Sequence, residues 1–440
     1  MAPAWVDRPY EDVVVVVIDE GMNEQGVVDG LCAKVGVESG SVAVKGSMRP
    51  LVWKVVQRIA DPGTGCRGVG LDIVNEFRSE FDGSAAEAIG SIGEAWGEGG
   101  APVVAAMPVA GWTVRDGRPV PKDLSGPIAH ASAEAGVGVG AVTGMYEGDS
   151  YWSVDFMLKR EGEGAIPTLP LALWARMQER EGDLVFVPGS PDQGGKVVVG
   201  KSAANPGGRE MKLPRMPVEV VDRATAKEVF GVEEGMRVNT MLVAVPGKAN
   251  RAKRTLRLAD VAAACDGSAE GNSKLNKWFN RKVVIIGDER ETRPDDQSLE
   301  PLTDIKDHPS GEQVPGVYAM ATAVQWLLDG RSVKFPFGGR TWVWTGVLCA
   351  AGVMGVWWGL GRRRLKWVWS GVAVGVVGVV WVAGVAWAYW LDGWYVGPWV
   401  PLSGLVLAGV GAWGVWRVRT GAEGGGRGVG IGTLNIGCVR

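Results

Sequence analysis

Histidine is almost absent from this sequence, which has only two, His130 and His308, among 440 residues. Zinc sites and hydrolytic triads draw on histidine and cysteine, and the five cysteines contain no CxxC pair. The sequence therefore contains no recognisable metal site or catalytic triad, and we predict that the protein binds neither a metal nor a cofactor. An exported domain could form a disulfide among the first three cysteines, but we expect buried free thiols. The cysteines are Cys32, Cys66, Cys265, Cys349 and Cys438.

Motifs that bind phosphate or support hydrolysis are also missing. No GxxxxGKS, GxxxxGKT, HExxH or GxSxG occurs. The segment RKVVIIGDERET, residues 281–292, offers the strand and the first glycine of a dinucleotide-binding turn. However, Asp288, Glu289 and Arg290 stand where further glycines would be needed to admit a pyrophosphate. We predict that the chain binds no nucleotide cofactor and is not an enzyme as it stands.

Charge is absent from three long runs near the C-terminus. Residues 341–361, 367–391 and 394–416 contain no Asp, Glu, Lys or Arg. Each run is long enough to cross a hydrocarbon core, which takes about 20 helical residues. Buried helices of a soluble core are the alternative, but such helices normally keep a polar stripe. We therefore predict three transmembrane helices, with the lipid bilayer as a partner.

The distribution of tryptophan and of basic residues predicts how these helices are oriented. Thirteen of the 21 tryptophans lie between Trp342 and Trp416, many near the ends of the runs, where an indole can lodge at the headgroup level. Short basic loops stay in the cytoplasm, and the second loop holds only Asp392. We predict a multi-pass protein of the plasma (inner) membrane, with a large domain, residues 1–335, outside and a glycine-rich cytoplasmic tail, residues 417–440. The basic residues in the first loop and the C-terminal flank are Arg362, Arg363, Arg364, Lys366, Arg417 and Arg419.

The large domain is acidic. Residues 341–440 hold eight Lys/Arg and two Asp/Glu, which leaves 38 and 47 for residues 1–340. Nucleic acid is excluded as a partner because phosphate neutralisation needs a basic face. The one basic cluster, residues 248–257, has no interleaved aromatic residues and is interpreted as a solvated turn. The start, MAPAWVDRPYED, is too polar for an export signal, so we expect a leading helix upstream.

Strand-like and helix-like stretches alternate through the large domain. Continuous apolar runs predict buried strands, and apolar residues at helical spacing predict helices. This alternation predicts an α/β fold with a parallel or mixed sheet flanked by helices. Residues 181–245 are rich in glycine and proline and contain short strand-like pieces, whose arrangement the sequence does not predict. The last helix should pack on the last strand. The expected strands are residues 13–18, 68–74, 102–107 and 282–287, and the expected helices are residues 51–60, 85–96, 167–180, 258–265 and 317–328.

Acidic residues lie at the ends of two expected strands. Asp19 and Glu20 follow the first strand, and Asp72 lies within the second. Because ligands bind at the carboxyl ends of parallel strands, these acids together with Arg49 form the candidate ligand pocket. The alternative is that the acids cap the following turns. No catalytic residue is predicted.

Six segments of the large domain follow one another in an order typical of a known family. The opening strand ends in Ile-Asp-Glu, and the second strand carries Leu-Asp-Ile at residues 71–73. Asp260 and Arg49 occupy positions that match the family pattern. In this order the segments resemble the second type of CHASE domain, an extracytoplasmic sensory module of bacterial adenylate cyclases, histidine kinases and serine/threonine kinases. The segments are VVVVVIDEGM (13–22), SMRPL (47–51), GVGLDIV (68–74), AIPTLPLALWA (165–175), LRLADVAAACDG (256–267) and RKVVIIGD (281–288), the last followed by Glu300, Pro301 and Leu302 and by VPGVYAMATAVQWLLDGR (314–331).

Three positions depart from the family pattern. Met320 stands where the family has histidine, Thr322 stands where it has asparagine, and residues 151–153 replace its Asp-Gly and Arg. The resemblance covers about residues 11–335, and continues to about residue 418 when the three spans that follow the family's domain are included.

The resemblance implies a receptor whose outer domain senses an unidentified small molecule or physical stimulus. After Arg419 no room is left for a kinase or cyclase fold. The preferred hypothesis is a sensor and membrane anchor that lacks its own output domain and signals as a homodimer or through a cytoplasmic cyclase or kinase partner. The alternative is the truncated N-terminal part of a cyclase or protein kinase receptor. A membrane-bound α/β enzyme is disfavoured by the missing motifs.

Overall fold

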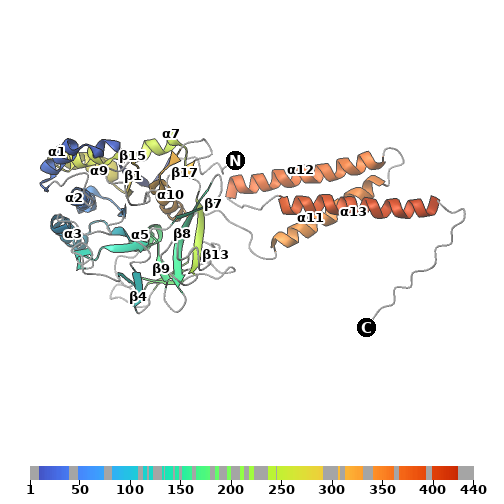
Figure 1. Cartoon of the computed structure of the whole chain (residues 1–440), viewed down its shortest axis with the longest axis horizontal. Coiled ribbons are helices and arrows are strands. Elements are labelled where there is room, and N and C mark those ends of the chain that lie inside the picture. Colours follow the sequence, from blue (N-terminus) through green and yellow to red (C-terminus); the bar gives the residue numbers. More distant parts are fainter. Residues whose placement is uncertain are drawn as a thin grey trace. The chain divides into compact units, whose positions relative to one another are not determined.

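The structure is a computed structural model of the whole chain (Figure 1). The chain forms two compact units, residues 1–334 and residues 335–440. Several features named above lie outside the residues it describes, namely His130, His308, Cys438, residues 300–302, the loop 361–365 and the tail beyond residue 424. The described residues are 9–38, 48–73, 82–107, 112–115, 118–121, 131–132, 134–141, 144–147, 151–160, 165–178, 184–187, 196–199, 209–212, 218–221, 236–243, 245–290, 306–307, 313–330, 340–360, 366–392 and 399–424.

A six-stranded sheet forms the centre of the first unit. Its strand order is β15-β1-β16-β2-β3-β6, and all five neighbouring pairs are parallel. The strand β16 therefore lies between β1 and β2, although it is the last of the six in the sequence. The bounds are β1 Val13–Ile18, β2 Gly68–Asp72, β3 Val103–Met107, β6 Gly138–Ala141, β15 Thr255–Arg257 and β16 Val283–Asp288.

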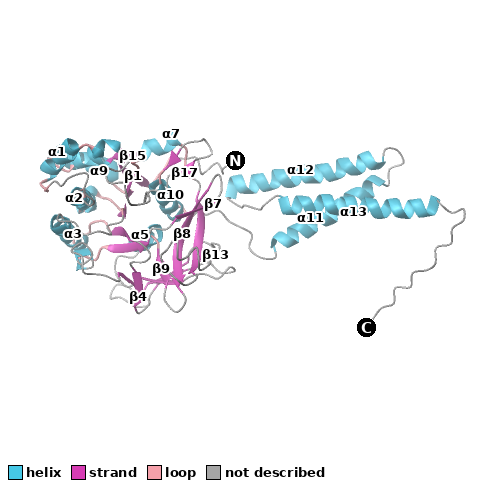
Figure 2. Cartoon of the chain, in the orientation of Figure 1, coloured by secondary structure: helices cyan, strands magenta, loops and turns pink. Residues whose placement is uncertain are grey.

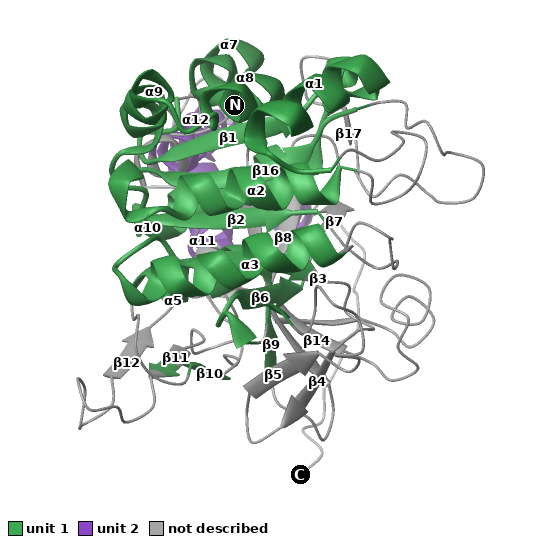
Figure 3. Cartoon of the chain, turned by 90° about the vertical axis from the view of Figure 1, so that its left-hand side faces the viewer, with its two compact units in different colours: residues 1–334 green, residues 335–440 purple. Residues whose placement is uncertain are grey.

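Helices cover both faces of this sheet. One face carries α1, α2, α3, α8 and α9, which lie in front of the strands in Figure 3. The other face carries α5 and α10, which pack on each other and on the strands. The prediction of a parallel sheet flanked by helices is thus confirmed. The bounds are α1 Gln25–Val35, α2 Arg49–Ala60, α3 Asp82–Gly97, α5 Leu169–Gln178, α8 Leu258–Ala264, α9 Ala269–Phe279 and α10 Gly316–Leu328.

The central strands are buried on both faces, as their unbroken β-branched runs predict. Every residue of β1 and of β16 is buried. Alternate residues of β1 (Val14, Val16 and Ile18) join Val284 and Ile286 of β16 in one core beneath the five-helix layer. The helix α10 is buried along almost its whole length and contacts both β1 and β16. The last helix thus packs on the last strand, as predicted.

Outside the main sheet, the described strands pair antiparallel (Figure 2), and most of them lie between β6 and the short helix α7 (Lys248–Arg251). The expected helix 167–180 begins only at Leu169, because residues 165–167 pair with β8 as β9. The stretch 181–245, which sequence reasoning left unordered, contributes five of these strands. The bounds are β4 Trp112–Arg115, β5 Arg118–Pro121, β7 Gly144–Glu147, β8 Tyr151–Arg160, β9 Ala165–Pro167, β10 Leu184–Val187, β11 Lys196–Val199, β12 Arg209–Lys212, β13 Val218–Val221, β14 Met236–Val243, β17 Lys306–Asp307 and β18 Gln313–Val314.

The second unit contains three helices, α11 Arg340–Leu360, α12 Lys366–Asp392 and α13 Trp399–Gly424. Within the part of the chain that the structure describes, one helix is long and apolar enough to cross a membrane, Val368–Trp387 in α12, with a mean hydropathy of 2.1. Only 6% of its apolar window is buried. The apolar stretch Thr345–Leu360 of α11 is shorter.

Candidate functional site

The carboxyl ends of three neighbouring strands bring acidic side chains to one edge of the sheet. Asp19 directly follows β1, and Asp72 is the last residue of β2. Between them, β16 ends at Asp288 and is followed by Glu289; Asp288 is opposite Ile18, and Gly287 is opposite Asp72. Neighbouring strands lie about 4.8 Å apart, so these side chains originate within about 10 Å of one another. We refer to Asp19, Asp72, Asp288 and Glu289 as the acidic edge.

Asp72 is the most perturbed carboxyl of the acidic edge. No hydrogen bond to its side chain occurs among the described residues, and burial raises its pKa to about 7. A carboxylate that caps a turn accepts hydrogen bonds, which lower rather than raise its pKa. The raised pKa is that of a desolvated carboxyl group, which can exchange a proton near neutral pH. The turn that Asp72 would cap, residues 74–81, lies outside the described residues.

Asp19 and Glu20 lie in different environments. Asp19 precedes the short 3-10 helix η1, Glu20–Asn23, but its side chain makes no capping hydrogen bond there. Its Oδ2 lies 3.9 Å from Nε of Arg257, a mostly exposed residue whose shorter contact, 2.8 Å, is with Asp260. Glu20 is exposed and accepts a hydrogen bond from the Asn23 amide. Asp19 thus belongs to the acidic edge, whereas Glu20 faces solvent.

Arg49, the basic residue expected in the pocket, is the first residue of α2. Its side chain is buried.

A buried ion pair stabilises the acidic edge. Arg290 donates from Nε to Oδ1 of Asp288 at 2.9 Å and from Nη2 to Oδ2 at 2.7 Å. A third hydrogen bond, 3.0 Å long, joins its Nη1 to Oδ1 of Asn23 and so ties η1 to the end of β16. Two-point geometry of this kind favours arginine over lysine. Sequence reasoning missed these residues, although the rule that selected Asp19, acids directly after a parallel strand, applies equally to Asp288 and Glu289.

Glu289 connects the acidic edge to α10. The hydroxyl of Tyr318 donates to Oε2 of Glu289 at 2.9 Å, and the guanidinium carbon of Arg251 lies 4.9 Å from the centre of the Tyr318 ring. Burial is the main reason that the pKa of Glu289 is raised; Asp19 and Asp288 raise it further, and Tyr318 and Arg251 lower it. Burial also raises the pKa of Tyr318, so its hydroxyl stays protonated and remains a donor.

The basic cluster that contains Arg251 is not the solvated turn that the sequence suggested. Arg251 is buried and donates to the carbonyl oxygen of Pro246 at 2.9 Å. Arg254 donates from Nε to the carbonyl oxygen of Tyr10 at 3.1 Å. The interpretation was wrong for these two residues because their guanidinium groups reach partners that are distant in sequence, the Tyr318 ring for Arg251 and the Tyr10 carbonyl oxygen for Arg254. Lys248 and Lys253 are exposed, as a solvated turn requires.

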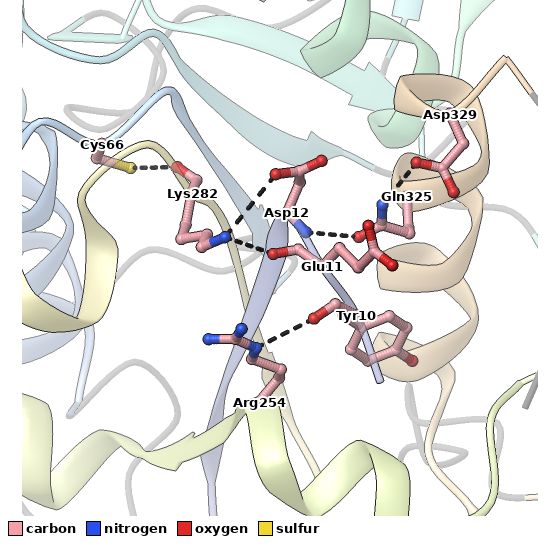
Figure 4. A network of polar contacts seen from close by, with 8 residues as sticks. All are labelled: Tyr10, Glu11, Asp12, Cys66, Arg254, Lys282, Gln325 and Asp329. Carbon is pink, nitrogen blue, oxygen red and sulfur yellow. Dashed lines mark hydrogen bonds and ion pairs between the residues drawn. The ribbon is translucent and has the colours of Figure 1, made fainter. Parts of the chain in front are cut away.

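A second polar cluster, at the opposite end of β1, fixes α10 to the sheet (Figure 4). The backbone N–H of Asp12 donates to Oε1 of Gln325 at 2.9 Å, and Nε2 of Gln325 donates to Oδ1 of Asp329 at 3.0 Å. The side chain of Lys282 donates to the carbonyl oxygen of Glu11 and lies 3.8 Å from the Asp12 carboxylate. These groups satisfy one another, so this cluster has a structural role and the acidic edge is the better candidate for a ligand site.

The cysteines within the described residues are free, and three of them are buried in the first unit. Burial raises the pKa of Cys32 to about 11 and that of Cys66 and Cys265 to about 12. Thiols with such values are unreactive at neutral pH. They belong to the core and not to a functional site.

Comparison with known proteins gives one match. Residues 4–361 match the protein-family model of the CHASE2 domain. No curated protein and no solved structure matches the chain.

Proposed function

This chain belongs to the CHASE2 domain family, and on that premise we propose that it is a membrane-anchored sensor whose α/β unit lies outside the cytoplasm. CHASE2 domains are extracellular sensory domains of membrane proteins. The observation that carries the proposal is the family match over residues 4–361, which spans the α/β unit and reaches the end of α11.

The exposure of apolar side chains in the second unit supports anchoring by three helices. Among the residues whose side-chain exposure the structure describes, which leaves out most of the antiparallel strands of the first unit, the exposed large apolar side chains belong to α11, α12 and α13. They include Trp357 at 62% and Leu407 at 71% exposure. A soluble protein would expose such a surface to water at a large cost in free energy, whereas lipid tails cover it without that cost.

The packing between these helices is also of the kind found in membranes. A Cβ at Gly352 of α11 would lie 2.6 Å from the backbone oxygen of Leu405 in α13, so the two backbones approach closely. The hydroxyl of Ser370 in α12 donates to the carbonyl oxygen of Val356 in α11 at 3.0 Å. Helices in lipid gain no hydrophobic free energy from associating with one another. Close packing at small residues and hydrogen bonds from hydroxyl groups stabilise their contacts instead.

Reporter fusions test the topology. We expect a periplasm-active phosphatase fused after Gly361 to be inactive, because the first loop is basic and should stay in the cytoplasm. The same enzyme fused after Gly393, in the loop that holds only Asp392, should be active. High activity at Gly361 together with none at Gly393 would show the reverse orientation and defeat the proposal.

The acidic edge is the proposed site of ligand recognition. The stimulus that the protein senses is a small molecule or a physical change at the membrane. The signal passes to a cyclase or kinase, which is either a cytoplasmic partner or part of a longer chain. The proposed signalling unit is a homodimer. We propose that the chain has no enzymatic activity of its own. Full-length protein in detergent should not hydrolyse ATP or GTP, and hydrolysis abolished by Asp72→Asn would refute this.

A further inference from the structure

The helix α10 connects the acidic edge with the part of the chain that leads to the second unit. At its start, Val317 packs against Gly287, and Tyr318 contacts Glu289. Its 13 residues extend about 20 Å at 1.5 Å per residue and end at Leu328, shortly before the second unit begins at residue 335. Of the described helices of the first unit, α10 is therefore the one nearest in sequence to the second unit.

Tyr318 is held from several sides. Its side chain donates to Glu289 and packs beneath Arg251, whereas its carbonyl oxygen accepts hydrogen bonds from the hydroxyls of Tyr10 at 3.2 Å and Thr322 at 2.7 Å. The contacts to Tyr10 and Thr322 involve only neutral groups. Of these hydrogen bonds, the one to Glu289 changes in strength with pH, because its acceptor is a carboxyl group that can be protonated.

We propose that the Tyr318–Glu289 hydrogen bond is a proton-sensitive link through which the acidic edge controls the first turn of α10. The inference rests on the proposed sensor function and assigns a mode of regulation to the same site. When Glu289 is ionised, Tyr318 donates to a charged acceptor and the bond is strong; when Glu289 is protonated, the bond joins two neutral groups and is weaker. Protonation therefore loosens the start of α10, and a cationic group that draws the Glu289 carboxylate away from Tyr318 has the same effect.

The groups around Glu289 act in opposite directions on its protonation. Asp19, Asp288 and burial favour the protonated form, and Arg251 and the Tyr318 hydroxyl favour the ionised form. Their balance raises the pKa of Glu289, so protonation begins at a higher pH than for a glutamate in water.

Hydrogen exchange of the full-length protein in detergent tests the link. Exchange of the α10 amides, residues 320–324, is compared between wild type and Tyr318→Phe at pH 8 and at pH 5. Because the two proteins are compared at one pH, the intrinsic pH dependence of exchange cancels. We expect Tyr318→Phe to accelerate exchange about tenfold at pH 8 and by a smaller factor at pH 5, because protonation of Glu289 replaces a charged acceptor with a neutral one.

Two further variants separate the link from a general loosening of the helix. Tyr10→Phe makes the same chemical change against the same helix but removes only neutral contacts, so its effect should be equal at the two pH values. In a Glu289→Gln background, Tyr318→Phe should have the same small effect at pH 8 and pH 5, because an amide does not titrate.

Three outcomes would overturn the proposal. They are no effect of Tyr318→Phe, an effect of equal size at both pH values, and a pH dependence that Tyr10→Phe shares. These results are independent of the reporter fusions. A reversed membrane orientation would defeat the sensor function without altering the exchange result, and a negative exchange result would leave the topology intact.

Discussion

The Cγ2 methyl of Val317 occupies the space that a side chain at Gly287 would need, since a Cβ built on Gly287 would lie 2.5 Å from it. The same Cβ would lie 3.6 Å from the Cβ of Asp72. The absence of a side chain at residue 287 therefore lets α10 lie directly on the end of β16, beside the acidic edge.

Gly287→Ala should destabilise the protein by about 1–3 kcal/mol, because the clash lies in a buried and closely packed contact. The helical Gly90 of α3 is a matched control, since a Cβ there meets nothing within 4 Å. Gly90→Ala should stabilise by about 0.5–1 kcal/mol through the higher helix propensity of alanine. Chemical denaturation of the full-length protein in detergent measures both, and equal effects would show that α10 does not crowd Gly287.

Asp72→Asn should stabilise the protein at alkaline pH. The folded state raises the pKa of Asp72 from 3.8 to about 7, so it holds a proton that the unfolded chain has already released between about pH 4 and pH 7. Wild-type stability should fall as pH rises through this window, and the asparagine variant should escape that loss. We expect a gain of about 2–4 kcal/mol above pH 7 and almost none below pH 4.

Melting curves of wild type and Asp72→Asn from pH 4 to pH 9 measure this difference. The same substitution at Asp29, an exposed residue of α1, is the control and should change Tm little at any pH. A loss of stability at pH 8 would show that Asp72 makes a stabilising contact as an anion. The expected gain would fit a residue kept for binding at the expense of stability.

Arg290→Met should destabilise the protein by about 3–5 kcal/mol, because it removes the guanidinium that neutralises the buried Asp288 carboxylate. Adding Asp288→Asn should recover at least about half of that loss, since the remaining side chain is neutral. Denaturation of the two single variants and the double variant gives the coupling energy. Simple additivity of the two losses would mean that the pair contributes nothing specific.

Val324→Asp should destabilise the protein by about 3–5 kcal/mol, since Val324 is fully buried in α10 and the new charge has no partner. Ala269→Asp places the same charge at an exposed position in the first turn of α9 and should be neutral or slightly stabilising. Thermal melts of the full-length protein compare them. A Val324→Asp variant that melts with wild type would mean that α10 is not docked.

Four of the six strands of the main sheet (β1, β2, β3 and β16) were predicted, whereas the short edge strands β15 and β6 were not. The two most central of the predicted strands have sequences with few alternatives. Val13–Ile18 and Val283–Ile286 are uninterrupted β-branched runs, and such runs fit only a strand buried on both faces. The helix α1 was missed because its two glycines, Gly26 and Gly30, weaken the helical pattern. The antiparallel strands after β6 were missed because short segments acquire their pairing from partners far away in the chain.

The candidate site was predictable only in part. Asp19 and Asp72 follow from the rule that parallel strands present their carboxyl ends together. The position of β16 between β1 and β2 could not be inferred, because no local sequence feature indicates which strands become neighbours in the sheet. For the same reason the contacts of Tyr318 with Glu289 and Arg251 were not foreseen, since each joins elements whose neighbours are set by the sheet order.

The central place of β16 also bears on the order of events during biosynthesis. Residues 13–18 and 68–72 leave the ribosome long before residues 283–288, yet β1 and β2 each bond to β16 and not to each other. No stable sheet centre can form until almost the whole domain has been made, and such long-range closure is slow. A nascent chain built in this way cannot complete its sheet through most of its synthesis, which is compatible with the export that the proposed function requires.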